Sequence, residues 1–90
     1  SVMAVSTPWI ESIEVRRRWR DEDRAAGRRG IDDRRADETH AWYEDLTGEA
    51  DRYYDRCVGD DTGDPREALV QLIAVAGAAI DAMGRDGGPA

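Results

Sequence analysis

The chain of 90 residues contains no lysine and no phenylalanine, and it has one cysteine and three prolines. The single cysteine, Cys57, cannot form a disulfide within the chain, and no cationic segment is followed by an apolar one, so we expect a reducing cytoplasm. Few β-branched residues occur outside two short runs, which favours helices over sheet. The longest uncharged run, residues 68–80, is shorter than the roughly 20 apolar residues that span a bilayer, so we expect no membrane partner.

Charge is distributed unevenly along the chain. Residues 1–35 hold nine arginines and seven acids, a net charge of +2, whereas residues 36–90 hold four arginines and 13 acids, a net charge of −9. Nucleic-acid affinity depends largely on basic side chains that neutralise phosphates. We therefore expect no nucleic-acid partner, although the N-terminal arginines could bind a small polyphosphate.

The clearest helix start lies at residues 64–67, Asp-Pro-Arg-Glu. Asp64 can cap the helix, Pro65 suits its first position, and Glu67 stands three residues after the cap. The pattern predicts a helix over residues 65–83 that ends at Gly84, followed by a flexible glycine-rich tail at 85–90. One face of this helix is apolar, with Leu69, Leu72, Ile73, Ala76, Ile80 and Met83, and most of its other positions are apolar too.

Two further helices are predicted before this one. The first covers residues 8–25 with Thr7 as its cap, and the second covers residues 37–58 with Asp37 as its cap. Residues 27–35 lack periodicity, so we expect a mobile charged connection there. The loop at residues 59–63 has the length that joins antiparallel helices. The sequence therefore predicts a single all-α domain over residues 1–90, a three-helix domain with an antiparallel hairpin of helices two and three.

The apolar residues of helices two and three also predict how the domain is covered. Helix two has a stripe at three- and four-residue spacing, formed by Trp42, Leu46, Ala50, Tyr53, Tyr54 and Cys57. We expect these side chains, with Tyr43, to pack in the core, although the aromatic residues could instead stack a base. Helix three is apolar on both sides, and a three-helix monomer can cover only one of them. We therefore expect a homodimer that completes a helical bundle.

Two segments carry a family resemblance. Leu-Thr-Gly-Glu-Ala-Asp-Arg at 46–52, followed by Arg-Glu-Ala-Leu-Val-Gln-Leu at 66–72, resembles the two metal-binding segments of the MazG-like all-α NTP pyrophosphatases. The stretch at 13–19, with Glu14 and three arginines, resembles the helix rich in glutamate and arginine that precedes these segments in phage and actinobacterial members. The resemblance implies Mg²⁺ as cofactor and hydrolysis of a nucleoside triphosphate to a monophosphate and pyrophosphate.

The residues at the family's metal-binding positions differ from its pattern. The family's carboxylates fall on Gly48, Glu49 and Arg52 in the first segment and on Ala68 and Gln71 in the second, so that Glu49 alone is retained. Because Mg²⁺ needs a cage of oxygen ligands, the resemblance implies an impaired pyrophosphohydrolase. The alternative function is a non-catalytic helical dimer that serves as a protein-interaction or nucleotide-binding module.

Candidate site residues follow from these two hypotheses, each with a structural alternative. Glu44, Glu49, Asp51 and Asp55 could form a displaced metal site, or they could be a solvated acidic face. Glu67 could be a further metal ligand, or it could only complete the cap of its helix. The arginines that could bind substrate phosphates, or else pair with neighbouring acids, are Arg16, Arg17 and Arg52.

Overall fold

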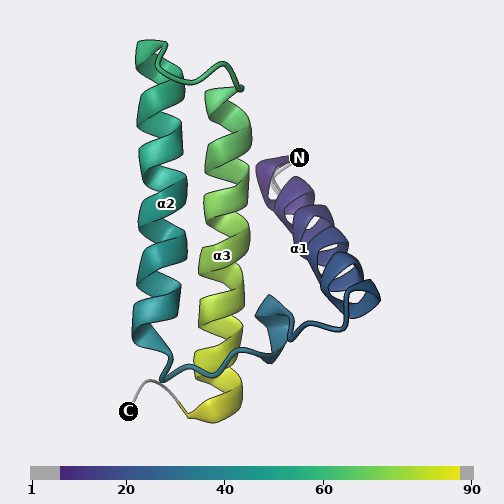
Figure 1. Cartoon of the computed structure of the whole chain (residues 1–90). Helices are drawn as coiled ribbons and strands as arrows, with labels where there is room; N and C mark the ends of the chain where they lie inside the picture. Colours follow the sequence, from purple (N-terminus) through teal and green to yellow (C-terminus); the bar gives the residue numbers. More distant parts are fainter. Residues whose placement is uncertain (1–6, 88–90) are drawn as a thin grey trace, which may run out of the picture.

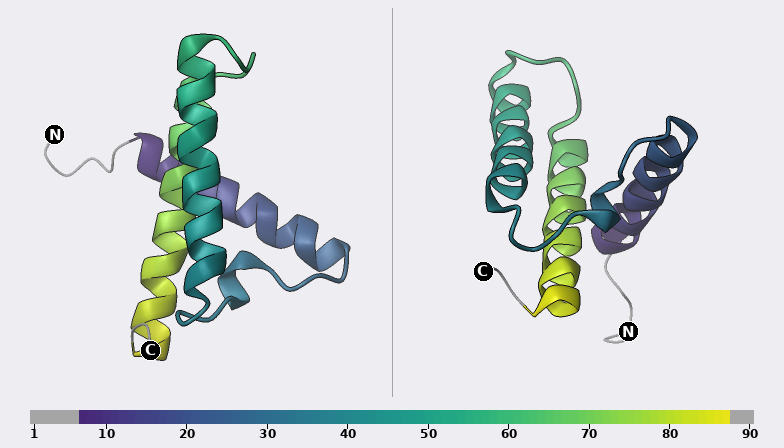
Figure 2. Two further views of the ribbon diagram at one scale, coloured as in Figure 1. Left: turned by 60° about the vertical axis from the view of Figure 1, so that its left-hand side comes forward. Right: turned by 60° about the horizontal axis from the view of Figure 1, so that its bottom comes forward.

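The computed structural model describes residues 7–87, and within them it contains three α-helices and one short 3-10 helix. Helix α1 spans Thr7–Ala25, η1 spans Ile31–Asp33, α2 spans Thr39–Val58 and α3 spans Pro65–Asp86. Helices α2 and α3 run antiparallel side by side, and α1 crosses α3 on the side away from α2 (Figure 1, Figure 2). Helix α3 is therefore the central helix and contacts both others. The predicted all-α fold and its hairpin are confirmed.

Helix α3 begins as predicted and ends later. Asp64 caps it by accepting a hydrogen bond from the backbone N–H of Arg66 at 2.9 Å. The predicted end at Gly84 is wrong, because the helix continues to Asp86 and stops at Gly87, whose φ of 82° is left-handed. Arg85 and Asp86 therefore belong to the helix and not to a flexible tail, while residues 88–90 lie outside the described part of the chain.

The other helix starts also differ from their predicted positions. Thr7 is already helical and is not the cap of α1. Helix α2 begins at Thr39, two residues later than expected, with Glu38 and not Asp37 at its N-cap. The carboxylate of Glu38 accepts the backbone N–H of Arg35 at 2.6 Å and pairs with Arg29, which holds the chain in a turn before the helix starts.

The connection between α1 and α2 is anchored, contrary to the prediction that it is mobile. Ile31 of η1 is buried in the core. The guanidinium of Arg85 donates to the backbone carbonyls of Asp32 at 3.0 Å and Arg34 at 2.8 Å. The carboxylate of Asp86 accepts the backbone N–H of Ala36 at 2.8 Å, and this bond lowers the pKa of Asp86. The end of α3 thus holds the connection in place.

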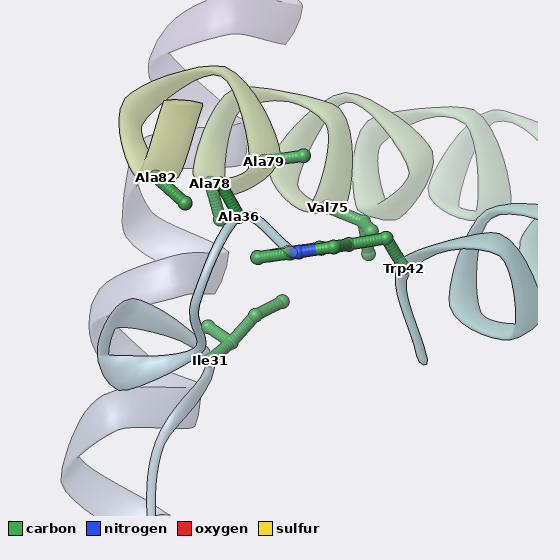
Figure 3. Close-up of a cluster of buried hydrophobic side chains, with 7 residues drawn as sticks. All are labelled: Ile31, Ala36, Trp42, Val75, Ala78, Ala79 and Ala82. Carbon is green, nitrogen blue, oxygen red and sulfur yellow. The ribbon is translucent and has the colours of Figure 1, made fainter. Parts of the chain in front are cut away.

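Trp42 is at the centre of the larger core cluster. Its ring lies between Ile31 and the small residues of α3, which include Val75, Ala78 and Ala79 (Figure 3). The indole Nε1 donates to the carbonyl of Arg35 at 2.9 Å, so the buried polar atom is paired. The guanidinium of Arg34 lies 4.6 Å from the ring centre and is itself bonded to Asp45 at 2.8 Å. The predicted core position of Trp42 is confirmed.

The core is built on the small residues of α3. The buried residues of this helix are Ala68, Val70, Ala74, Val75, Gly77, Ala78, Ala79 and Ala82. Small side chains let α1 and α2 approach the helix closely, so its larger residues remain outside. In α1, likewise, Ser12 and Val15 are buried against α3, whereas Trp9, Ile10 and Ile13 are exposed.

Helix α3 is also the most apolar helix of the described chain. Its length and composition would suffice to cross a membrane, with a mean hydropathy of 1.5 in its most apolar 18-residue window. The core helix of a soluble protein meets the same criterion, and 44% of this window is buried within the fold. The helix therefore fits a soluble protein.

Candidate functional site

The candidate metal and substrate residues of α2 lie on one face of the hairpin, where they pair with each other and with α3. Arg52 donates to the Glu49 carboxylate at 2.9 and 3.0 Å. The side-chain amide of Gln71 is oriented with its NH2 group toward Glu49, and in this orientation it donates to the same carboxylate at 3.1 Å. Arg52 thus lies beside the one carboxylate that matches the resemblance and balances its charge. We call the surface formed by Glu49, Arg52, Arg56, Glu67 and Gln71 the paired face.

Arg56 joins both helices and the loop between them. Its guanidinium donates to Asp61 at 3.1 Å, to the backbone carbonyl of Asp64 at 3.0 Å and to Glu67 at 3.2 Å. The bond from Arg56 lowers the pKa of the Asp61 carboxyl. Glu67 therefore pairs with an arginine of α2 instead of completing the cap of α3, a contact that its position in the sequence does not indicate.

Glu49 has the most unusual environment of these acids. Its side chain is 13% exposed, and burial raises its pKa because the charged form loses hydration. The attraction and hydrogen bonds from Arg52 act in the opposite direction and are the smaller effect. A largely buried carboxylate with a shifted pKa is often part of a functional site, but this one already has its cation.

The remaining metal candidates lie apart from the paired face. Glu44 contacts His40 at 3.0 Å, and Asp51 is exposed two turns further along α2. Within residues 7–87, no three His, Cys, Asp or Glu side chains are grouped so that they could hold a metal ion. Because Mg²⁺ requires oxygen ligands free to coordinate it, the arginine-paired carboxylates Glu49 and Glu67 of one chain do not fit this ion.

The arginine candidates of α1 line a shallow cavity. Arg16, Arg17 and Arg20 surround it with Ile13 and Asp32, and its volume is about 230 Å³. Arg16 is held by Asp32 at 2.8 Å and by Asp81 at 3.0 Å, and Arg17 contacts Glu14 at 3.3 Å. Arg16 and Arg17 therefore lie together, Arg52 lies on another helix, and each of the three is paired with at least one acid.

The opposite face of the hairpin is apolar and uncovered in the single chain. On a helix, residues two positions apart point in different directions, so Leu69 lies on a different side of α3 from Glu67, and Tyr54 on a different side of α2 from Arg52. We call this surface the open face and define it by Tyr43, Leu46, Ala50, Tyr54, Leu69, Leu72, Ile73, Ala76, Ile80 and Met83. It has no charged member.

The most exposed large side chains of α2 and α3 include several on the open face. Ile80 is 65% exposed, Tyr54 63%, Tyr43 62%, Met83 42% and Leu69 41%. A groove of about 310 Å³ lies between the two helices, and the residues of both that line it include Tyr43, Leu46, Ala79 and Met83. The open face therefore extends from α2 to α3 at this end of the hairpin.

The prediction that the tyrosines of α2 and Cys57 pack in the core is wrong. Tyr43 and Tyr54 were expected in the core and lie on the surface, Tyr53 is 38% exposed, and Cys57 is exposed as well. The apolar stripe of α2 is real, but only Trp42 is fully buried in it. Sequence spacing identified the stripe, and it could not show whether the stripe faces the core or solvent.

Comparison of this chain with protein-family models, with curated proteins and with solved structures gives no match. The resemblance of residues 46–52 and 66–72 to the MazG-like pyrophosphatases therefore stays a prediction.

Proposed function

We propose that this chain is a non-catalytic association domain that binds a protein through its open face, and that it works in the cytoplasm. The observation that supports the proposal is the number of large apolar side chains that this face exposes. Five of them are exposed by 41% to 65%. Exposed apolar patches of this kind mark interaction sites, whereas single exposed apolar residues are ordinary.

The paired face supports the same proposal. Arg52 forms an ion pair with Glu49, and Arg56 forms one with Glu67, so positive and negative charges are balanced there within one chain. A ligand at this face would have to displace bonds that connect α2 with α3 and the intervening loop. The open face offers a surface that a partner can cover without breaking any such bond.

Photo-crosslinking in expressing cells tests the proposal. Benzoylphenylalanine in place of Tyr54 puts the probe on the open face, and the same residue in place of Glu22 puts it on the exposed surface of α1 as a matched control. We expect irradiation to give a protein adduct of discrete mass from position 54 and none from position 22. Adducts from neither position, or equally from both, would contradict the proposal.

A second candidate function is Mg²⁺-dependent hydrolysis of a nucleoside triphosphate. It is favoured by the position of Glu49, which is largely buried between α2 and α3 and is the one acid that matches the resemblance. Calorimetric titration of Mg²⁺ or Mn²⁺, with and without a non-hydrolysable dNTP analogue, tests it. Metal-dependent nucleotide binding that is lost in Glu49→Gln would support this candidate, and the absence of binding at millimolar metal would rule against it.

A further inference from the structure

The open face has enough area for a stable interface. Taking about 200 Å² for a large side chain, its five most exposed residues present on the order of 550 Å² to solvent. Specific, stable interfaces bury about 600–1,000 Å² per partner and commonly about 800 Å². The half-buried members, Leu46, Leu72 and Ile73, add to this area. One partner of standard size could therefore cover the whole face.

The charge of the chain indicates what kind of partner that is. The protein carries a net charge of −7, and its acids lie outside the open face. A strongly basic partner would be drawn to those acidic surfaces and not to an uncharged one. A second copy of this chain would be repelled by them, and the uncharged open face is where two copies can meet without placing like charges opposite one another.

We infer that the open face is covered by a second copy of the chain, related by a two-fold axis, so that two α2–α3 hairpins form a four-helix bundle. This inference rests on the proposed function and names its partner. A two-fold interface uses the same patch on both copies, and the open face is apolar from Tyr43 and Met83 at one end of the hairpin to Tyr54 and Leu69 toward the other. Helix α1 packs on the side of α3 away from α2 (Figure 2), and the five large side chains of the open face stay exposed beside it.

Sedimentation velocity of the purified full chain, from low- to high-micromolar concentration, tests the inference. We expect the wild type to form a dimer and Ile80→Arg to weaken it by at least about 30-fold, the effect of losing a residue that contributes strongly to an interface. Tyr54→Arg repeats the test from α2. Ala25→Arg adds the same charge at the exposed end of α1 and should leave the dimer intact. Far-UV circular dichroism checks that each variant is folded.

Mixing variants provides a second readout that a folding defect cannot imitate. Ile80→Arg and Ile80→Asp place opposite charges on the open face, so an equimolar mixture should form more dimer than either variant alone. A dimer that persists in both arginine variants would overturn the inference, because the copies would then meet elsewhere.

A monomeric wild type over the whole concentration range would also overturn it. Flotation with phosphatidylcholine vesicles then distinguishes the occupants: a monomer that floats points to a lipid surface, and the proposed function fails with the inference. A monomer that does not float, together with a crosslinked adduct at position 54 whose mass is not twice that of the chain, leaves the proposed function standing with a different protein as partner.

Discussion

Gly77 gives the sharpest test of how α1 is docked on α3. It is a buried helical residue of α3 at the crossing of the two helices. A Cβ added there would lie 3.4 Å from Nη1 of Arg16 and 3.7 Å from the ring of Trp9, which are ordinary contacts. Replacing a mid-helix glycine by alanine raises helix stability by about 1 kcal/mol. We therefore expect Gly77→Ala to increase the free energy of unfolding by up to about 1 kcal/mol.

A larger residue at the same position should have the opposite effect. The additional carbons of Gly77→Leu would displace either the Trp9 ring or the Arg16 guanidinium, which is bonded to Asp32 and Asp81. Overpacking of this kind costs about 1–3 kcal/mol. In a domain of this size each 1 kcal/mol shifts the melting temperature by about 4–8 °C, so the alanine and leucine variants should be well separated.

Gly48 provides the matched control for both substitutions. It lies in the exposed middle of α2, and a Cβ added there meets nothing within 4 Å. Gly48→Ala and Gly48→Leu should both stabilise, because only helix propensity changes. Thermal and urea unfolding at one fixed protein concentration measure all four variants, since self-association makes stability depend on concentration. If Gly77→Leu is as stable as Gly77→Ala, α1 does not pack on α3 as described.

Three further predictions concern the core, the paired face and the connection. Trp42→Ala should lower the free energy of unfolding in urea by about 3–5 kcal/mol, because it empties the centre of the core, and a loss below 1 kcal/mol would contradict the packing in Figure 3. Burial raises the pKa of Glu49 above its ordinary value of 4.5, so the carboxylate ionises less readily in the folded protein than in the unfolded chain. The wild type therefore loses stability as the pH rises from 4.5 through the raised pKa. Glu49→Gln should therefore be more stable than the wild type at pH 7, and this advantage should disappear by pH 4 in urea titrations; an advantage independent of pH would refute the assignment. Arg85→Ala should speed amide hydrogen exchange at residues 31–36 and leave that of α2 unchanged, whereas unaltered exchange there would mean that the connection is held by other contacts.

The helices themselves could be predicted because their signals are local. The Asp64 cap, Pro65 and the left-handed glycine Gly59 act within one helical turn of the boundary they set, and the structure places α3 and the loop accordingly. The connection could not be predicted in the same way. Ile31 is buried by a 3-10 helix of three residues, which is too short to show any periodicity, and the bonds from Arg85 join positions more than 50 residues apart.

The side of α3 that faces the core could not be predicted from the sequence, for a different reason. Most of its surface is apolar, so periodicity alone does not choose which side faces the core. The fold buries the alanine-rich side, because α1 and α2 pack closely against small residues, and leaves Leu69, Ile80 and Met83 outside. The same ambiguity explains why Tyr43 and Cys57, which belong to a genuine apolar stripe, are exposed.

The two faces of the hairpin therefore differ in their contacts: the paired face is bonded within the chain, and the open face is exposed. Where the family resemblance expects carboxylates, Arg52 and Gln71 instead bond to Glu49, and the neighbouring Arg56 bonds to Glu67, so the polar side is occupied by contacts between α2, α3 and their loop. These bonds connect the two helices and their loop in the single chain and use the groups that a ligand would need. The apolar side makes no comparable contact within residues 7–87 and still exposes its largest side chains. Association at the open face would therefore let this small domain bury more apolar surface without giving up bonds it already has.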